Sequence, residues 1–473
     1  MKKHKSIADI VKVTFSNFAL LLAGVATSFI LPKYFSLTDF GNYKIFNLYS
    51  TYIILLQFGI AEGIYLKYGG KKLDDVSHDE FTGYLKTTLL VESVVAAIII
   101  ALAFNLPGDY KTIFLFLAIN IIITNFTNIY QFLSQSVQRF SELSFRNVLK
   151  SVFIVLAVFA IVIINRFTNY KVGYELLLAL LTLINLLLLL WYIFTYRSLL
   201  SRHSKINPSK AWNLFKIGFP LCLSNIISSL ILTMDRQIVS LGFATSEYAI
   251  YSFAYSLLTL ASTIITSIAV VLFPILKQKS ISVLKKEYSQ TVSLICVTVG
   301  LMAISYFPLA WFVKRFLPLY TGSIDIFRII IPGLIITSPI SIVMHNYYKT
   351  LGLNMEFFVR SLVTLILAIA SNIIAFIIFH SMSSISIASI FVLSFWYCIE
   401  EYRLKKEFNF KSVNNACYIV LICSSFYASS FFLSLRLGAL VYFISFLAIT
   451  LIMKRESILN YYNAHFNKEL SNE

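Results

Sequence analysis

The sequence predicts an all-α polytopic membrane protein with about 14 transmembrane helices, arranged as two six-helix lobes and a C-terminal helix pair. Three observations support this fold class. Hydrophobic residues make up 58% of the 473 residues and charged residues only 13%, whereas a soluble domain carries about 25% charged residues. Apolar stretches of the ~20 residues needed to span a bilayer recur along the whole chain. Finally, short motifs of the first half recur in the second half.

The predicted membrane spans leave little sequence outside the bilayer. They cover residues 10–31, 43–66, 84–106, 111–135, 148–165, 174–195, 212–234, 248–276, 289–313, 326–348, 357–379, 383–399, 414–433 and 437–453. The longest connections, near 67–83, 197–211 and 400–413, are too short to bury a core of their own. We therefore expect no soluble catalytic domain and no enzyme activity.

The positions of the basic residues predict the orientation. With a cytoplasmic N-terminus, 29 of the 39 Lys and Arg residues fall on the cytoplasmic side and ten on the other. This distribution obeys the positive-inside rule and places both termini in the cytoplasm. The net charge of +17 is spread over every inner loop. We therefore expect these residues to orient helices and contact anionic lipid, and we expect no nucleic-acid partner.

The internal repeat predicts two lobes of the same orientation. Pairs 208 residues apart are Ser16-Asn17 with Ser224-Asn225, Phe35 with Phe243, Thr38 with Ser246, Asp39 with Glu247, Phe40 with Tyr248, Gly41 with Ala249, and Tyr43 with Tyr251. Pairs 214 residues apart are Glu142 with Glu356 and Arg146 with Arg360. Because each lobe has an even number of helices, a pseudo-two-fold axis along the membrane normal would relate them. The predicted parts are 1–200, 201–400 and 401–473.

Polar residues recur every three or four positions on corresponding helices of both lobes. The residues expected to line a cavity are Asn17, Asn47, Asn128, Gln131, Gln135, Asn225, Asp235, Arg236, Tyr251, Tyr255, His345 and Lys349. Hydrogen bonds between helices, worth about 0.6–2 kcal/mol each, explain any one stripe as well as a cavity does. Six stripes on matching helices favour a shared water-filled cavity between the lobes.

Ionisable residues at membrane depth are costly and usually face a cavity or each other. Arg236 is the first candidate to attract a phosphate, because its planar guanidinium binds oxyanions bidentately. Arg146, Arg360 and Arg328 are further candidates, although a role in orienting the helices explains Arg146 and Arg360 equally well. Three carboxylates are candidates for binding a coupling cation, namely Glu62, Glu92 and Asp235. Glu62 also lies close enough to a helix end to snorkel.

No metal or cofactor site is expected. The segment 74–80 holds five potential ligands, but without a glycine turn or further ligands a solvated loop is the better interpretation. All five cysteines fall in or beside predicted spans, so they indicate neither a disulfide framework nor metal-ligand spacing.

Two stretches resemble a known transporter family. One is 31–43, an aliphatic-Pro segment leading to an acidic-Phe-Gly-x-Tyr turn, and the other is Asp235-Arg236 followed by Glu247-Tyr248-Ala249-Ile250-Tyr251. They resemble the polysaccharide transporter family of the multidrug/oligosaccharidyl-lipid/polysaccharide (MOP) flippase superfamily, and most closely its bacterial O-antigen and capsule repeat-unit flippases (Wzx-like proteins). The likeness in helix count and lobes extends over most of the chain.

The resemblance implies two six-helix bundles around a central cationic cavity in the bacterial cytoplasmic membrane. It implies that an oligosaccharide repeat unit on undecaprenyl diphosphate crosses the membrane by alternating access, for O-antigen, capsule or exopolysaccharide biosynthesis. The implied partners are this lipid-linked oligosaccharide, membrane lipid, H+ or Na+ as coupling ion, a polysaccharide polymerase and a chain-length regulator. The extra helix pair is similar to that of fourteen-helix relatives, among them peptidoglycan-precursor flippases.

Two other functions remain open. A multidrug or cation antiporter of the same superfamily would need a buried carboxylate, which Glu62, Glu92 or Asp235 could provide. A membrane polysaccharide polymerase would need a sizeable outer loop for acceptor sugars, whereas the outer connections here have about a dozen residues or fewer.

Overall fold

The computed structural model describes residues 2–168, 171–260, 280–408 and 413–470. The regular secondary structure of these residues is entirely helical, with no strand, which confirms the predicted fold class. Eleven of the described helices are long and apolar enough to cross a membrane, or thirteen if each of two sharply bent pairs forms one span. The eighth predicted span, 248–276, runs beyond the described residues. The total of fourteen and the symmetry axis stay predictions.

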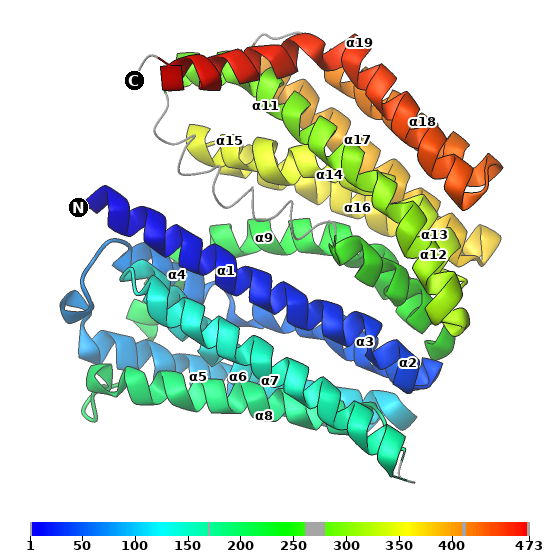
Figure 1. The fold of residues 1–473 in the computed structure, drawn as a ribbon. Coiled ribbons are helices and arrows are strands. Elements are labelled where there is room, and N and C mark those ends of the chain that lie inside the picture. The colour runs from blue at the N-terminus through cyan, green and yellow to red at the C-terminus, as the bar shows by residue number, and fades with distance from the viewer. Residues whose placement is uncertain (1, 169–170, 261–279, 409–412, 471–473) are drawn as a thin grey trace. The chain divides into compact units, whose positions relative to one another are not determined.

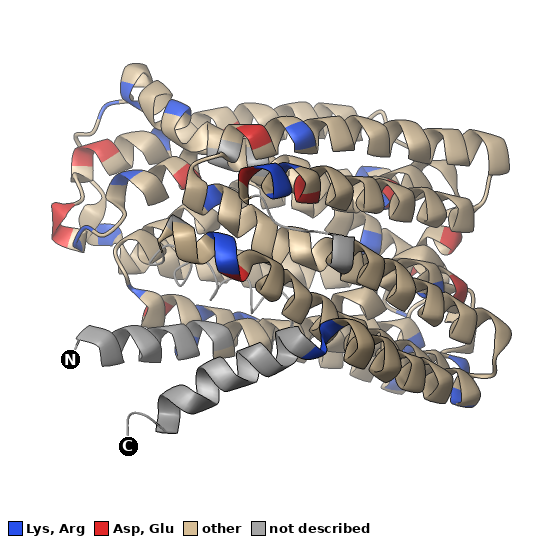
Figure 2. Cartoon of the chain, turned by 90° about the horizontal axis from the view of Figure 1, so that it is seen from above, with Lys and Arg blue, Asp and Glu red and all other residues tan. Residues whose placement is uncertain are grey.

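Most of each helix carries no charge, as Figure 2 shows, and many large apolar side chains are exposed. On one helix, for example, Ile373, Ile374, Ile377 and Ile378 are all exposed. Exposed apolar surface of this extent indicates contact with lipid rather than water. The protein is therefore a multi-pass membrane protein.

Contacts divide the chain into two compact units. Unit 1 comprises Met1–Ser229 with Phe243–Ser252, and unit 2 comprises Leu230–Gly242 with Phe253–Glu473. In Figure 1 the elements of unit 1 run from blue to green and those of unit 2 from green to red. One helix, Pro208–Gly242, gives its first part to unit 1 and its last part to unit 2.

Unit 1 is built around a long central helix. Its elements are α1 (Lys2–Phe29), α2 (Leu31–Tyr34), α3 (Leu37–Ile53), η1 (Ile54–Gln57), α4 (Ile60–Tyr68), η2 (Leu73–Asp75), α5 (His78–Ala103), α6 (Gly108–Ser136), α7 (Phe140–Phe167), α8 (Tyr174–Thr195), η3 (Arg197–Leu199) and the first part of α9 (Pro208–Gly242). Helix α6 packs against α3, α4, α5, α7 and α8, and α1 packs against α7. The central position of α6 puts its polar residues in contact with several neighbours.

The second predicted span is bent rather than straight. Helices α3 and α4 meet at 57°. Phe58 and Gly59 adopt left-handed φ values of 52° and 80°, a conformation that costs little only for glycine. Gly59 also lies against α9, where a Cβ would come within 2.7 Å of the Phe219 nitrogen. The bend is thus fixed by local backbone conformation and by a close helix contact.

Unit 2 contains the last part of α9, residues 253–260 of the helix 245–260, and a further set of helices and turns. They are α11 (Ile281–Met302), η4 (Ala303–Ser305), α12 (Tyr306–Phe316), η5 (Pro318–Tyr320), α13 (Ser323–Ile330), α14 (Pro332–Ser338), η6 (Pro339–Met344), α15 (His345–Leu351), α16 (Asn354–Phe379), α17 (Met382–Phe408), α18 (Val413–Phe432) and α19 (Leu435–Leu470). Helix α11 packs against α14, α18 and α19, and α16 packs against α17. The span from α13 to α15 is divided where Pro332 and Pro339 remove backbone donors, and η6 is a π-helical turn.

The recurring acidic turns open corresponding helices. Asp39 lies in the first turn of α3, where its amide donates to Ser36. Glu247 lies in the first turn of the helix 245–260, where its carboxylate accepts from the Ala244 amide. Carboxylates at a helix N-terminus are stabilised by the unpaired amides and the helix dipole. The two turns also touch, because Gly41 packs directly on the backbone of Thr245.

Candidate functional site

In unit 1, the polar stripe of α6 has two structural environments. Asn128, Gln131 and Gln135 are half-buried and lie on successive turns, so their amides are accessible on one face. Asn120, the first residue of that stripe, instead donates to Thr182 of α8 at 2.7 Å and is buried. The stripe therefore combines a helix-helix contact with three accessible amides that can bind hydroxyl groups.

Three further predicted residues of unit 1 are also accessible. Asn17 of α1 and Asn225 of α9, which are 208 positions apart, are both exposed, and Asn47 of α3 is half-buried. Tyr251 differs from them, because its side chain is 0% exposed within the described residues. Its phenol thus packs inside the protein, where it can support a site but cannot meet a polar ligand in this conformation.

In unit 2, Asp235 and Arg236 share one aromatic partner. The hydroxyl of Tyr255 donates to the buried carboxylate of Asp235. The guanidinium of Arg236 lies 4.5 Å from the centre of the same ring and donates to the Leu232 carbonyl at 2.8 Å. Its Nε is buried without a hydrogen-bond partner among the described residues. The Arg236 guanidinium is thus held in place, while its Nε–H donates no hydrogen bond to the described residues.

Three other predicted residues of unit 2 lie on two separate helices. His345 stacks on Phe357 with ring centres 4.6 Å apart, and Lys349 is half-buried one turn further along α15. Arg328 of α13 donates to the Tyr306 hydroxyl at 2.9 Å and pairs with Asp325 at 3.4 Å. Its guanidinium therefore already has an aromatic and an acidic partner within the unit.

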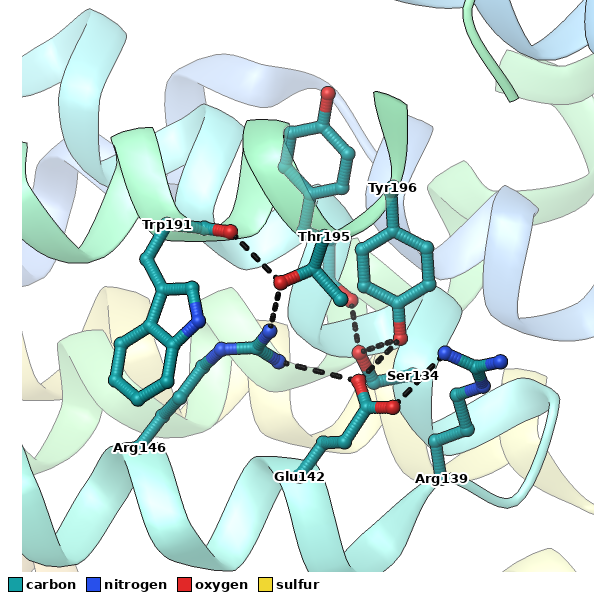
Figure 3. Close-up of polar contacts among 8 residues, drawn as sticks. Ser134, Arg139, Glu142, Arg146, Trp191, Thr195 and Tyr196 are labelled. Atoms are coloured by element: carbon teal, nitrogen blue, oxygen red, sulfur yellow. Dashed lines mark hydrogen bonds and ion pairs between the residues drawn. The ribbon is translucent and has the colours of Figure 1, made fainter. Parts of the chain in front are cut away.

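Arg146 belongs to a polar cluster at the start of α7 (Figure 3). Its guanidinium pairs with Glu142 at 3.5 Å and donates to Thr195 at 2.7 Å. It also lies 4.0 Å from the centre of the Tyr192 ring, and its side chain is only 4% exposed. Because these contacts enclose the guanidinium, they favour a role in joining α7 to α8.

A phenol and a second arginine complete this cluster. Tyr196 donates to Glu142 at 3.4 Å. Its hydroxyl also forms a hydrogen bond with the Ser134 hydroxyl at 2.8 Å, in which either group can be the donor. Burial raises the pKa of the Tyr196 phenol, so the hydroxyl keeps its proton and remains a donor. Arg139 pairs with the other oxygen of Glu142 at 2.8 Å.

The corresponding residues of unit 2 form a similar cluster. Arg360 pairs with Glu356 at 3.5 Å, one helical turn apart, and with Glu400 of α17 at 3.0 Å. Arg403 of α17 pairs with Glu356 at 2.6 Å. Each member of the 214-residue repeat thus forms the same ion pair within its helix and joins that helix to the next.

The two remaining carboxylate candidates are buried in unit 1. Glu62 is 4% exposed at the start of α4 and lies against the Cys222 thiol of α9. Glu92 is completely buried in α5 and accepts from Asn125 of α6 at 2.9 Å. Asn125 was not among the predicted residues, because it lies one residue outside the spacing of the α6 stripe. No group of three or more His, Cys, Asp or Glu residues suited to a metal occurs in the described parts.

Comparison with known proteins identifies the family. The family described as "Polysaccharide biosynthesis protein" matches residues 7–280, more than half of the chain. The chain belongs to this family. Comparison with curated proteins gave no match. The match confirms the resemblance to the polysaccharide transporters of the MOP superfamily that the acidic turns indicated.

Comparison with solved structures shows that this protein has a transporter fold. It is similar to lipid II flippase MurJ in an inward closed conformation, with a TM-score of 0.72 and 13% identity over 96% of this chain and 100% of that one. It is also similar to a multidrug resistance MATE family transporter of the MOP superfamily in an outward-facing conformation, with a TM-score of 0.58 and 11% identity over 85% and 95% of the two chains. The fold is therefore that of MOP transporters.

Proposed function

We propose that the protein is a flippase that moves an oligosaccharide repeat unit linked to undecaprenyl diphosphate across the bacterial cytoplasmic membrane. The family match carries this proposal, because it relates the chain to polysaccharide biosynthesis. Similarity to the whole of a lipid II flippase supports it, since this chain covers 100% of that structure. The product would enter O-antigen, capsule or exopolysaccharide biosynthesis, and both termini would be cytoplasmic.

The polar residues suit such a substrate. Isolated charges cost tens of kcal/mol to bury in hydrocarbon in the Born limit, so a diphosphate needs polar protein groups along its path. The accessible amides Asn17, Asn128 and Gln131 can bind sugar hydroxyls. Arg236, anchored on Tyr255 with an unused donor, is the residue that we assign to the diphosphate. Alternating access would carry the head group while the lipid tail stays in the bilayer.

A multidrug or cation antiporter is the second candidate. The similarity to MATE transporters and the buried carboxylates Glu62 and Glu92 favour it. The TM-scores of 0.58 for the MATE structure and 0.72 for the flippase favour the flippase fold.

A deletion strain tests the choice between the two. We expect loss of surface polysaccharide and accumulation of lipid-linked repeat units inside the cell, with unchanged resistance to toxic cations. A deletion that lowers drug resistance and leaves the surface polysaccharide intact would instead identify an antiporter.

Complementation of that strain tests Arg236. The variant Arg236→Ala should insert and fold but fail to restore surface polysaccharide, while Arg315→Ala, which removes an exposed arginine of the same unit, should restore it. Normal polysaccharide with Arg236→Ala would refute the role of this residue but not the flippase function.

A further inference from the structure

Three buried side chains near the bend between α3 and α4 retain unpaired polar atoms. Glu92 of α5 and Asn125 of α6 are 0% exposed, and Gln57 of η1 is 1% exposed. The Oε2 of Glu92, the Oδ1 of Asn125 and both amide atoms of Gln57 have no hydrogen-bond partner in the described part of the chain. Because buried polar atoms are nearly always paired, this concentration of unpaired atoms points to a ligand.

Hydrogen bonds join these elements into one group. The amide nitrogen of Asn125 donates to Glu92 Oε1 at 2.9 Å and to the Ile53 carbonyl at 3.2 Å. Ile53 is the last residue of α3, and η1 with Gln57 follows it directly. The turn η1 packs against both α5 and α6. An interrupted helix thus brings a carboxylate, an amide oxygen and a backbone carbonyl together.

No basic residue of α4, α5, α6 or η1 is placed to neutralise Glu92. Helix α6 has no charged residue between Lys111 and its end, and Lys111 is 14 residues from Asn125, about 21 Å along a helix. Turn η1 has no charged residue. The lysines of α4 and α5 are used elsewhere, since Lys67 donates to Glu80 and Lys86 to the Ser204 carbonyl. A bound cation would supply the compensating charge that these elements lack.

We propose that Glu92, Asn125 and the Ile53 carbonyl, together with the Gln57 side-chain oxygen, bind one Na+. Hard cations select carboxylate and carbonyl oxygens. The single carboxylate balances one positive charge, so a divalent ion would leave an uncompensated charge at membrane depth. A proton would satisfy only one of the unpaired oxygens, whereas Na+ coordinates several at once. Interrupted helices in transporters bind coupling ions in this way.

The use of this site for coupling rests on the proposed transport function, but Na+ binding itself does not. A binding experiment without any lipid-linked substrate therefore separates the two. The full-length protein, purified in detergent, is unfolded thermally in NaCl titrations, with choline chloride keeping the ionic strength constant. Binding of radioactive Na+ is measured on the same samples.

For the wild-type protein we expect Tm to rise with NaCl and to level off, because a ligand that binds only the folded state stabilises it. Glu92→Gln should keep the Asn125 hydrogen bond but lose both the Tm rise and the bound Na+. Asn125→Ala should shift half-saturation to about tenfold higher Na+, a loss of about 1.4 kcal/mol. Glu175→Gln, the same change at an exposed carboxylate of unit 1, should leave the response intact.

A Na+ response that persists in Glu92→Gln, or that is missing in the wild-type protein, would overturn the proposal. If Glu92→Gln fails to fold, Asn125→Ala alone decides, because an unchanged half-saturation point would exclude this amide as a ligand. Normal surface polysaccharide in a variant that no longer binds Na+ would count against the coupling role only.

Discussion

Arg360 donates to Glu400 at 3.0 Å, and the Glu400 side chain is 0% exposed. In the related cluster of unit 1, Arg146 pairs with Glu142, which is 35% exposed and keeps Arg139 as a second partner at 2.8 Å. The two arginines therefore hold carboxylates in different environments, although they occupy equivalent positions of the repeat.

This difference predicts an order of stability. Arg360→Ala should destabilise the protein by about 3–5 kcal/mol, because it leaves a buried carboxylate without its ion pair. Arg146→Ala should cost less, since Glu142 retains Arg139 and solvent. Thermal unfolding in detergent measures both. Glu400→Gln combined with Arg360→Ala should recover part of the loss, and equal destabilisation by the two single variants would contradict this account.

Gly41 is predicted to tolerate no larger residue. A Cβ at this position would overlap the Thr245 carbonyl and come within 2.7 Å of its methyl group. Gly41→Ala should therefore destabilise the protein by about 1–3 kcal/mol, as overpacking does. Gly24→Ala is the control, because Gly24 has no neighbouring atom within 4 Å and alanine favours an exposed helix by about 1 kcal/mol. A lower Tm for both variants would show that contact with Thr245 is not the cause.

Lys454 is predicted to hold α19 in place. Its ammonium is buried and donates to Ser293 of α11 at 3.2 Å and to Asn415 of α18. Lys454→Met should cost about 1–3 kcal/mol, because it removes buried hydrogen bonds from a charged donor, although Ser293 still donates to Asn415. Limited proteolysis and thermal unfolding would detect the loosened helix. Lys285→Met, at an exposed position of α11, should change neither measurement.

Tyr255 is predicted to act through its hydroxyl on Asp235 and through its ring on Arg236. Tyr255→Phe removes the hydroxyl that donates to Asp235 but keeps the ring under the guanidinium. It should lower stability while largely preserving surface polysaccharide in the complementation assay. Tyr255→Leu removes both contacts and should also impair display. If Tyr255→Phe abolished display as completely as Arg236→Ala, Asp235 would be the more important side chain.

Hydropathy predicted the helices well where one apolar stretch forms one straight helix. The segment 174–195 coincides with α8, and 357–379 ends with α16. It failed at 43–66, which was predicted as one helix but bends at Phe58 and Gly59. Hydropathy does not report backbone conformation, and the left-handed φ of Phe58 depends on tertiary contacts. Only Gly59 gave a local signal.

The site was predictable in part for a similar reason. Residue type and helical spacing identified Arg236, Glu92 and the accessible amides of α6, because charged and amide groups are rare in apolar spans. Spacing along one helix could not identify Asn125, whose importance comes from Glu92 on the neighbouring helix. The same spacing placed Tyr251 among the expected cavity residues, but its ring is fully buried. Contacts between helices, unlike periodicity within one, are not encoded in a local pattern.

At the bend, Gly59 also packs on the backbone of Gly218 in α9, and this close approach has a consequence for sequence variation in the family. A side chain on either residue would occupy the space of the other's backbone. Substitutions at the two positions therefore depend on each other. Relatives that keep this bend should have glycine at both positions, and those that have lost one glycine should have lost the other. Covariation between the two columns of a family alignment would then reveal which members share the bent second span.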